Sequence, residues 1–518
     1  MSVAVLHSAH IVGLHAEEVG VEVDVSHGLY SFSIVGLPDK AVDESKDRVI
    51  AALKNSHLRN PKTENHKVTV SLSPANTKKE GSHFDMPIAL SYLVASKQVA
   101  IPRDAGWFIG ELSLSGDILP AKGVLAIAQE AKKKGITSLY VPYDNKEEAA
   151  LIDGINVYGC KNLREVVFHF GGTIDGVQEL FSIPKTEATL LEETTTLTYT
   201  DFCDIKGQET AKRALEIAAV GGHNIALYGP PGTGKTMLAR AFTGILPHLS
   251  HDNAIEVTRI HSITKEKIKL ITQPPLRSPH HTASYVSIVG GGTNPRPGEI
   301  TLAHRGVLFL DEFPEFDKKV IESLREPLEE GHITVSRAKG TFTFPASCTL
   351  IASMNPCPCG FYGSKQKRCI CTPSDISRYA RKLSGPIMDR IDMWVPVLNI
   401  NYDMLSEKRE SEGSMSVRKR VEKGRLFSEK RFKESGVPHL YLNKDMKNKE
   451  LELSLHITPQ ALITLKKLST TSTLSPRAYH RVQRLARTIA DMRESKDVEE
   501  NDILEAFQYR PKLYEDSL

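Results

Sequence analysis

The 518-residue sequence lacks any uninterrupted run of about 18 apolar residues, the length that a membrane-spanning helix requires. Its first residues, Met-Ser-Val-Ala-Val-Leu-His, form neither a basic leader nor a cleavable apolar segment. Internal repeats and extended low-complexity tracts are missing as well. We therefore expect a cytoplasmic protein with no membrane association.

A large net charge of either sign is also missing, because the 66 Lys and Arg residues nearly balance the 63 Asp and Glu residues and leave +3 with His neutral. A nucleic-acid partner would have to be held by locally arranged cations, since the chain has no overall positive field. With 40% hydrophobic and 25% charged residues, the composition is typical of folded chains and not of disordered ones. At roughly 100 to 200 residues per domain, the length predicts two to four domains.

Cysteine is scarce, and seven residues in the whole chain are too few for a disulfide scaffold. Four of them nevertheless crowd into one short segment as two Cys-X-Cys pairs, formed by Cys357, Cys359, Cys369 and Cys371. Four thiolates on one loop can close a tetrahedral zinc site that orders the loop, and we favour this interpretation. Because Cys-X-Cys is tighter than the usual spacing, a redox-active cluster or four free thiols stay open as alternatives. The cations between the pairs are either nucleic-acid contacts or plain solvating charges: Lys365, Lys367 and Arg368.

Apolar periodicity divides the chain into an ordered series of parts. Residues 1–182 alternate β-rich runs with helical patterns, which is typical of an α+β domain. Residues 183–200 are rich in Thr and Glu with little periodicity, and they indicate an exposed linker. Residues 201–402 place a helical pattern, a strand-like run and a glycine-rich turn in the order of an open α/β nucleotide-binding sheet.

Residues 403–518 form the last part, which we expect to be mainly helical. The segment 406–450 carries 13 Lys and Arg against 8 Asp and Glu with few apolar residues, and it indicates a solvated stretch. A helical unit is expected to follow over residues 458–509.

The glycine-rich turn fits the phosphate-binding pattern G-x-x-x-x-G-K-[ST], and it stands between a strand-like run and a helix-like one. Glycines let the backbone curl until its N–H groups face an anion, and the helix start adds its positive dipole end. Lys235 is expected to reach the β- and γ-phosphates, and the Thr236 hydroxyl to ligate Mg²⁺. The residues of the motif are Gly229, Pro230, Pro231, Gly232, Thr233, Gly234, Lys235 and Thr236.

Two later apolar runs end in polar residues that can complete such a site. The run 306–310 is followed by Asp311, placed for Mg²⁺, and by Glu312, placed to polarise water. The run 349–354 is followed by Asn355, whose amide can orient the attacking water. Ligands bind beyond the carboxyl ends of the strands in open α/β sheets, so these side chains are expected beside the phosphate loop.

These elements resemble the Walker A, Walker B and sensor-1 elements of AAA+ ATPases. Within that class, SPHHTAS, GGGTNPRPGEITLAHRGVLFLDEFPEF, VSRAKGTFTFPASCTLIASMNPCPCG and LSGPIMDRIDMWV resemble the magnesium-chelatase-like YifB/ComM family, and the resemblance covers nearly the whole chain. It implies an α/β P-loop AAA+ core that uses ATP and Mg²⁺, and a C-terminal helical lid like that of magnesium chelatase. It also implies that Arg390 is an arginine finger acting on a neighbour's site and that Arg477 is sensor 2.

A finger acting in trans makes hydrolysis depend on ring assembly, and the resemblance implies a hexameric homo-oligomer. The implied partner is single-stranded or branched DNA, moved by helicase-like branch migration in recombination or natural transformation. The alternatives are a protein-remodelling ATPase, as in magnesium chelatase, and an ATP-dependent protease. The cysteine loop and the front domain described next favour the DNA motor over the chelatase subunit.

Residues 332–344 carry two β-like arms around Arg337-Ala338-Lys339-Gly340 and resemble the hairpin inserted before sensor 1 in this AAA+ clade. In related ring motors such hairpins point into the central pore. Arg337 and Lys339 are therefore candidate contacts to the phosphates of a threaded strand. Cations at a hairpin tip can equally serve to keep an edge soluble.

The segment 80–120 resembles the proteolytic domain of Lon-type proteases, of the ribosomal S5 domain 2-like fold, whose chemistry needs a serine activated by a lysine. The resemblance places His83 at the nucleophile position and Leu125 near the lysine position. We therefore expect an inactive domain that serves assembly or partner binding. Ser82 and Lys122 lie close by in the sequence and keep residual protease activity open as an alternative.

Overall fold

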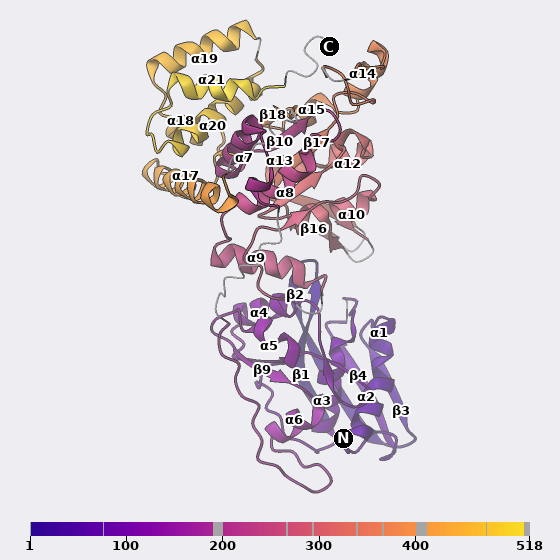
Figure 1. The fold of residues 1–518 in the computed structure, drawn as a ribbon. Helices are drawn as coiled ribbons and strands as arrows, with labels where there is room; N and C mark the ends of the chain where they lie inside the picture. Colours follow the sequence, from indigo (N-terminus) through magenta and orange to yellow (C-terminus); the bar gives the residue numbers. More distant parts are fainter. Residues whose placement is uncertain are drawn as a thin grey trace. The chain divides into compact units, whose positions relative to one another are not determined.

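The computed structural model describes residues 2–75, 77–189, 200–265, 268–292, 295–337, 340–364, 367–399, 412–472 and 474–511. The chain forms two compact units, one from the ranges Met1–Glu193 and His251–Ile271 and the other from Thr194–Ser250 and Thr272–Leu518 (Figure 1). Residues 251–271 thus lie within the 201–402 range of the sequence but belong to the first unit. Most of the linker predicted over 183–200 lies outside the described residues.

The first unit is built on a seven-stranded sheet in the order β3-β4-β2-β1-β5-β8-β9. β1, β2 and β4 pair antiparallel, and the remaining neighbours pair parallel. Along β2 the valines are buried while the residues between them are only partly covered, as expected for a sheet with one packed face. The strands are β1 Ser2–Val12, β2 His15–His27, β3 Ser31–Val35, β4 His66–Ser73, β5 Trp107–Phe108, β8 Ser138–Pro142 and β9 Asn156–Cys160, with β6 Glu111–Leu112 and β7 Ile118–Leu119 in a separate pair.

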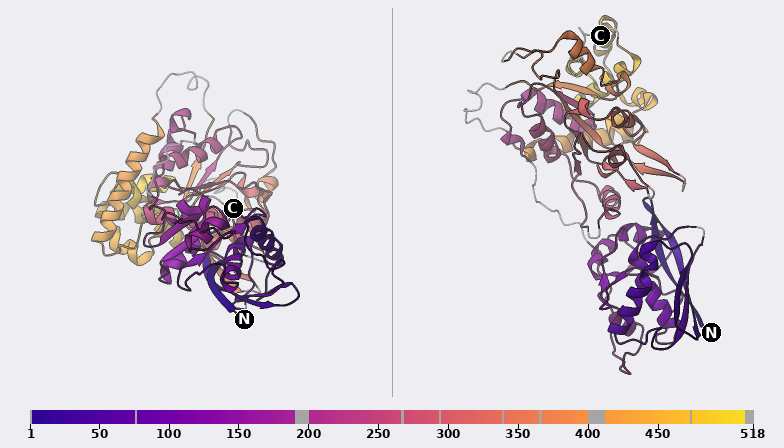
Figure 2. Two further views of the ribbon diagram at one scale, coloured as in Figure 1. Left: turned by 90° about the horizontal axis from the view of Figure 1, so that it is seen from below. Right: turned by 90° about the vertical axis from the view of Figure 1, so that its right-hand side faces the viewer.

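Helices of the first unit lie beside the long strands in the right-hand view of Figure 2, and both α3 and α4 contact β1 and β2. α3 packs on β1 and β2 and is apolar almost all round, in keeping with its burial in the core. α9 packs on α4, where the amide of Gly123 donates to the carbonyl of Ser262. The helices are α1 Lys40–Asp43, α2 Ser45–Asn55, α3 Asp85–Ala95, α4 Val124–Lys133, α5 Lys146–Ala149, α6 Leu163–His169 and α9 His251–Ser262.

The second unit contains a five-stranded sheet in the order β11-β14-β17-β10-β18, in which all neighbours pair parallel. The strands are β10 Ile225–Tyr228, β11 Leu276–Arg277, β14 Val307–Leu310, β17 Thr349–Met354 and β18 Met393–Pro396. Every residue of β14 and β17 is buried, which explains their continuous apolar runs. The predicted open α/β sheet is confirmed.

Helices and two hairpins surround this sheet. β15 His332–Arg337 and β16 Gly340–Pro345 form the predicted hairpin, and β12 Gly290–Gly291 pairs with β13 Arg296–Pro297. The helices are α7 Glu209–Gly221, α8 Lys235–Ile245, α10 Tyr285–Val289, α11 Glu299–Leu302, α12 Lys318–Ser323, α13 Arg325–Glu330, α14 Pro373–Ala380 and α15 Gly385–Met388.

The C-terminal part is helical, but its beginning differs from the prediction. The helices are α17 Ser414–Glu434, α18 Asn448–Ser454, α19 Pro459–Thr471, α20 Pro476–Met492 and α21 Glu500–Gln508. The prediction of a solvated stretch over 406–450 is wrong for α17, which buries Val417, Val421 and Phe432 on one face and packs on α7, α8 and α20. The buried residues form only a narrow stripe among many charged residues, so the apolar periodicity of the helix was not apparent in the sequence. None of the helices within the described ranges is long and apolar enough to cross a membrane.

Candidate nucleotide-binding site

Three parallel strands of the second unit end at one cavity of about 390 Å³. The loop after β10 and the first turn of α8 supply residues 231–237 of its lining, the end of β14 supplies Asp311 and Glu312, and the end of β17 supplies 353–355. Ligand crevices of open parallel sheets form at this edge. The structure therefore brings the phosphate loop, both acids and Asn355 together, although they are separated by up to about 120 positions in the sequence.

The backbone of the loop has the shape of an anion cradle. Gly232 and Gly234 have φ angles of 78° and 89°, a left-handed conformation that glycine adopts without strain. α8 begins at Lys235, so its first N–H groups, which have no partners within the helix, face the loop. Gly229 is required for a different reason, because a Cβ there would lie 2.0 Å from the carbonyl oxygen of Val397.

Lys235 crosses from the start of α8 to the opposite wall of the cavity. Its Nζ donates to the carbonyls of Gly229 and Pro230 at 2.8 and 2.9 Å, and to Oδ1 of Asn355 at 3.2 Å. Burial lowers the pKa of the amine below its usual value, while the charges of Asp311 and Glu312 act in the opposite direction. The Lys235 amine is therefore surrounded by oxygen atoms and lies in the cavity where it can contact a bound phosphate.

The hydroxyl of Thr236 donates to Oδ2 of Asp311 at 2.9 Å, and the hydroxyl of Ser353 donates to Oδ1 of the same carboxylate. A hydroxyl and a carboxylate in contact offer the hard oxygen ligands that Mg²⁺ prefers, so these residues fit the ion that the sequence implies. Ser353 was missed by sequence reasoning. The available signal was a serine that follows three apolar residues near the end of the run 349–354.

Glu312 leaves the strand in a left-handed conformation with φ of 53° and is about half exposed. Its Oε2 lies 3.4 Å from Nδ1 of His281, whose ring stacks near that of His280. Sequence reasoning gave this histidine pair no role. The structure therefore places His281 beside the carboxylate that is predicted to polarise water.

The two predicted arginines lie apart from the phosphate loop. Arg390 follows α15, and Arg477 lies in the first turn of α20. Both form ion pairs with one carboxylate, that of Glu329 on α13. Within the described part of the chain, neither arginine lines the cavity. This placement is compatible with a finger that serves a neighbouring subunit.

The predicted DNA contacts belong to the β15–β16 hairpin and to the cysteine loop. Arg337 is the last residue of β15, and Lys339 lies outside the described residues. Of the cations in the cysteine loop, Lys367 lies over the ring of Phe361 with its Nζ 4.7 Å from the ring centre. Lys365 lies outside the described residues.

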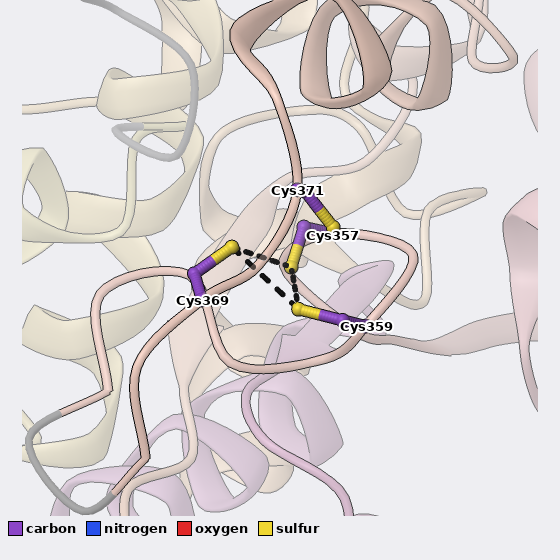
Figure 3. A group of neighbouring side chains, drawn as sticks. All are labelled: Cys357, Cys359, Cys369 and Cys371. Atoms are coloured by element: carbon purple, nitrogen blue, oxygen red, sulfur yellow. Dashed lines mark hydrogen bonds between the residues drawn. The ribbon is translucent and has the colours of Figure 1, made fainter.

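The four clustered cysteines converge after β17 (Figure 3). Sγ of Cys357 lies 3.4 Å from that of Cys359 and 3.7 Å from that of Cys369, and the Cys359 and Cys369 sulfurs are 3.5 Å apart. All four sulfurs, including that of Cys371, lie within 4.8 Å of one another, and none forms a disulfide. The loop therefore gathers four thiols into one group.

In the first unit, the two residues at the compared protease positions differ in their burial. His83 is partly buried and bonds through Nε2 to the carbonyl of Ala9 at 2.9 Å, and desolvation lowers its pKa to about 4. Leu125 is buried in α4. The hydroxyl of Ser82 donates to Glu111. Neither His83 nor Leu125 is the serine or the lysine that the compared chemistry requires.

Comparisons with known proteins match the chain along its length. Residues 201–405 match the family described as magnesium chelatase, subunit ChlI, residues 21–145 match subunit ChlI of Mg-chelatase, and residues 411–510 match its C-terminal family. The competence protein ComM of Haemophilus influenzae is 40% identical over 514 residues, which cover 98% of each chain. The uncharacterised protein YifB of Escherichia coli is 38% identical over 98% of this chain and 97% of its own. The magnesium-chelatase 67 kDa subunit of Chlorobaculum parvum is 28% identical over 159 residues, 30% of this chain and 23% of its own.

Proposed function

Since the chain belongs to the magnesium-chelatase-like YifB/ComM family and is an ATPase of the ComM/YifB type, we propose that it forms a hexameric ring that uses ATP hydrolysis to move DNA. The proposed substrate is single-stranded or branched DNA, and the proposed activity is helicase-like branch migration in recombination or natural transformation. One observation carries the ATPase part. Lys235, Thr236 and Asp311 meet in one cavity beyond the ends of parallel strands.

In this proposal the phosphate loop holds the triphosphate through its N–H groups, and the Lys235 amine moves from the loop carbonyls to the β- and γ-phosphates. Thr236 and Asp311 would hold Mg²⁺, which neutralises charge on the phosphate oxygens. Ser353 keeps the Asp311 carboxylate in place through its hydrogen bond. These residues bind and orient ATP before any bond breaks.

Hydrolysis then depends on residues around the γ-phosphate. Glu312 polarises the attacking water, and Asn355, which already contacts Lys235, orients it. Arg390 of the adjoining subunit and Arg477 as sensor 2 offset the negative charge that develops on the transferred group. Because the cavity of a single chain does not contain Arg390, assembly would control the rate.

Support for DNA as the cargo comes from outside the nucleotide site. The Haemophilus relative is named a competence protein, and the β15–β16 hairpin carries the proposed contacts Arg337 and Lys339. The region 1–182 is proposed to be an inactive Lon-like domain for assembly or partner binding, 201–402 the AAA+ core, and 403–518 a helical lid.

The experiment compares ATP turnover with single-stranded DNA, branched DNA or an unfolded protein added, together with a strand-displacement assay. We expect DNA to stimulate turnover, Lys235→Ala to abolish it, and Arg337→Ala with Lys339→Ala to weaken the stimulation. Lys433→Ala removes an exposed lysine of α17 and is the matched control, with unchanged activity. Indifference to every DNA would contradict the cargo, and absence of ATP binding would contradict the whole proposal.

A protein-remodelling ATPase is the second candidate, supported by the match to a magnesium-chelatase subunit over 159 residues. Stimulation by a folded protein partner and not by DNA would favour it. Protease activity is disfavoured, because His83 and Leu125 occupy the compared positions in place of the catalytic serine and lysine.

A further inference from the structure

The cysteine group lies immediately beyond the strand that carries Asn355. β17 ends at Met354, and the chain runs through Asn355 and Pro356 directly into Cys357. At the other end of the loop, Cys371 precedes Thr372, the residue that caps α14. The loop that carries the four thiols therefore connects the end of a central strand to the start of a helix (Figure 3).

The spacing of the sulfurs matches a metal site and does not match disulfides. Four sulfurs at about 2.3 Å from a central zinc ion are separated by about 3.8 Å along each tetrahedral edge. The separations of 3.4, 3.5 and 3.7 Å among Cys357, Cys359 and Cys369 are close to that value, and the Cys371 sulfur lies within 4.8 Å of the other three. A disulfide requires about 2.05 Å. The amide of Tyr362 also points at Sγ of Cys357, at 3.3 Å, as it would at a thiolate ligand.

We propose that Cys357, Cys359, Cys369 and Cys371 bind one structural zinc ion. An all-thiolate tetrahedral set suits zinc, a metal without redox chemistry, and it leaves no open coordination position for catalysis. Cys357 is buried against Ile376 and Ala380 of α14, so closing the site fixes the helix on the loop.

The same loop packs on the nucleotide site, and this part of the inference rests on the proposed function. Gly360 lies against the phosphate loop so closely that a Cβ there would be 2.8 Å from Cδ of Pro231 and 3.9 Å from Cγ of Asn355. The Gly360 amide donates to the carbonyl of Cys357 at 2.9 Å, which makes this turn part of the cysteine group. Zinc thus positions Asn355 relative to Lys235.

The test measures metal and activity separately. We expect about one zinc per full-length chain by elemental analysis, release of that zinc by a thiol reagent, and tetrahedral thiolate bands after replacement by cobalt. Cys369→Ser with Cys371→Ser should lose the zinc and lower ATP turnover. Cys203→Ser, which changes an exposed cysteine outside the group, should alter neither.

A wild-type chain that contains no zinc and gives no such cobalt spectrum overturns the site, and one that contains iron overturns the choice of metal. Full ATP turnover by the zinc-free chain overturns the link to Asn355. Zinc in a chain that never hydrolyses ATP would refute the proposed function and leave the metal site standing.

Glu329 on α13 contacts two different arginines through its two carboxylate oxygens. Oε2 pairs with Nη2 of Arg390, and Oε1 lies 3.5 Å from Nη2 of Arg477. Only 9% of the Arg390 side chain is exposed, and its Nε is buried with no hydrogen-bond partner among the described residues. The Arg390 guanidinium is therefore held by contacts within its own chain, and its Nε–H group has no hydrogen-bond partner among the described residues.

We infer that Glu329 is a positioning residue that restrains both arginines until the ring and the DNA are in place, an inference that rests on the proposed roles of Arg390 and Arg477. A carboxylate that accepts from a guanidinium offsets the charge that the transition state needs. α13 is followed by Gly331 and then β15, and Glu326 of α13 accepts a hydrogen bond from the amide of Thr334 in β15. A shift of the hairpin would therefore move Glu329.

The test compares Glu329→Gln with Glu330→Gln, since Glu330 is the next residue on α13 and forms no ion pair with either arginine within the described ranges. We expect Glu329→Gln to raise the DNA-free kcat by about two- to fivefold, the range of a partly exposed ion pair, with an unchanged KM for ATP. DNA should then stimulate it less than the wild type.

Glu330→Gln should behave as the wild type in every assay. Equal or lower DNA-free turnover in Glu329→Gln, or an equal rise in Glu330→Gln, overturns the restraint. A wild type without any ATPase would instead refute the proposed function.

Discussion

Gly229 is a position of the phosphate loop that has no room for a Cβ atom. An added Cβ would meet the carbonyl oxygen of Val397 at 2.0 Å, and the Val397 amide is itself bonded to Tyr228 at 2.8 Å. The backbone there cannot retreat without separating β10 from β18. The glycine is therefore required by the close approach of two strands and not by its own φ angle.

We predict that Gly229→Ala lowers the free energy of unfolding by about 1–3 kcal/mol, the usual cost of overpacking, and weakens ATP binding. Gly385→Ala is the matched control, because a Cβ at that position would meet no atom within 4 Å among the described residues, its chain neighbours and its own helix backbone aside. Its stability should change by less than about 0.5 kcal/mol. Thermal unfolding and nucleotide titration of both variants provide the measurement, and equal effects in the two variants would contradict the steric explanation.

At the residue scale, the sequence could predict side chains that stand at the ends of strongly patterned runs. Asp311, Glu312 and Asn355 each lie just after an apolar strand, so the end of the apolar run indicates their positions. Ser353, His281 and Glu329 were not predicted, since their importance comes from contacts with residues far away in the chain. Local periodicity contains no information on such pairs.

At the scale of elements, burial patterns were informative where they were regular. β14 and β17 could be recognised because every residue is apolar or small, and α8 because it follows a phosphate motif. α17 was missed because its buried face is narrow and includes a charged residue, Arg431, which pairs with Asp491 of α20 at 2.9 Å. A buried ion pair looks like solvated charge in a sequence.

The cysteine loop was also partly predictable from the sequence. Two Cys-X-Cys pairs predicted convergence of four thiols, and the structure confirms that they converge. The contact between Gly360 and the phosphate loop could not be predicted, since it depends on β17 lying beside β10 in the sheet.

At the scale of the whole molecule, the proposed arginine finger lies outside the nucleotide site of its own chain. The cavity contains the phosphate loop and the acids, whereas Arg390 is paired with Glu329 elsewhere in the second unit. A ring with head-to-tail contacts resolves this, because each interface joins one face of a subunit to a different face of the next. Each ATP site would then be built from two chains.

We predict that mixing two inactive variants restores activity. Arg390→Ala keeps an intact phosphate loop, and Lys235→Ala keeps an intact finger, so either variant alone should hydrolyse ATP at a rate near background. In a ring assembled at random from equal amounts, roughly a quarter of the interfaces join an intact loop to an intact finger. Turnover of the mixture should therefore approach about a quarter of the wild-type rate, if each interface works independently. A finger acting within its own chain would leave the mixture no more active than the sum of its parts, and unchanged thermal unfolding of both variants ensures that misfolding does not explain their separate inactivity.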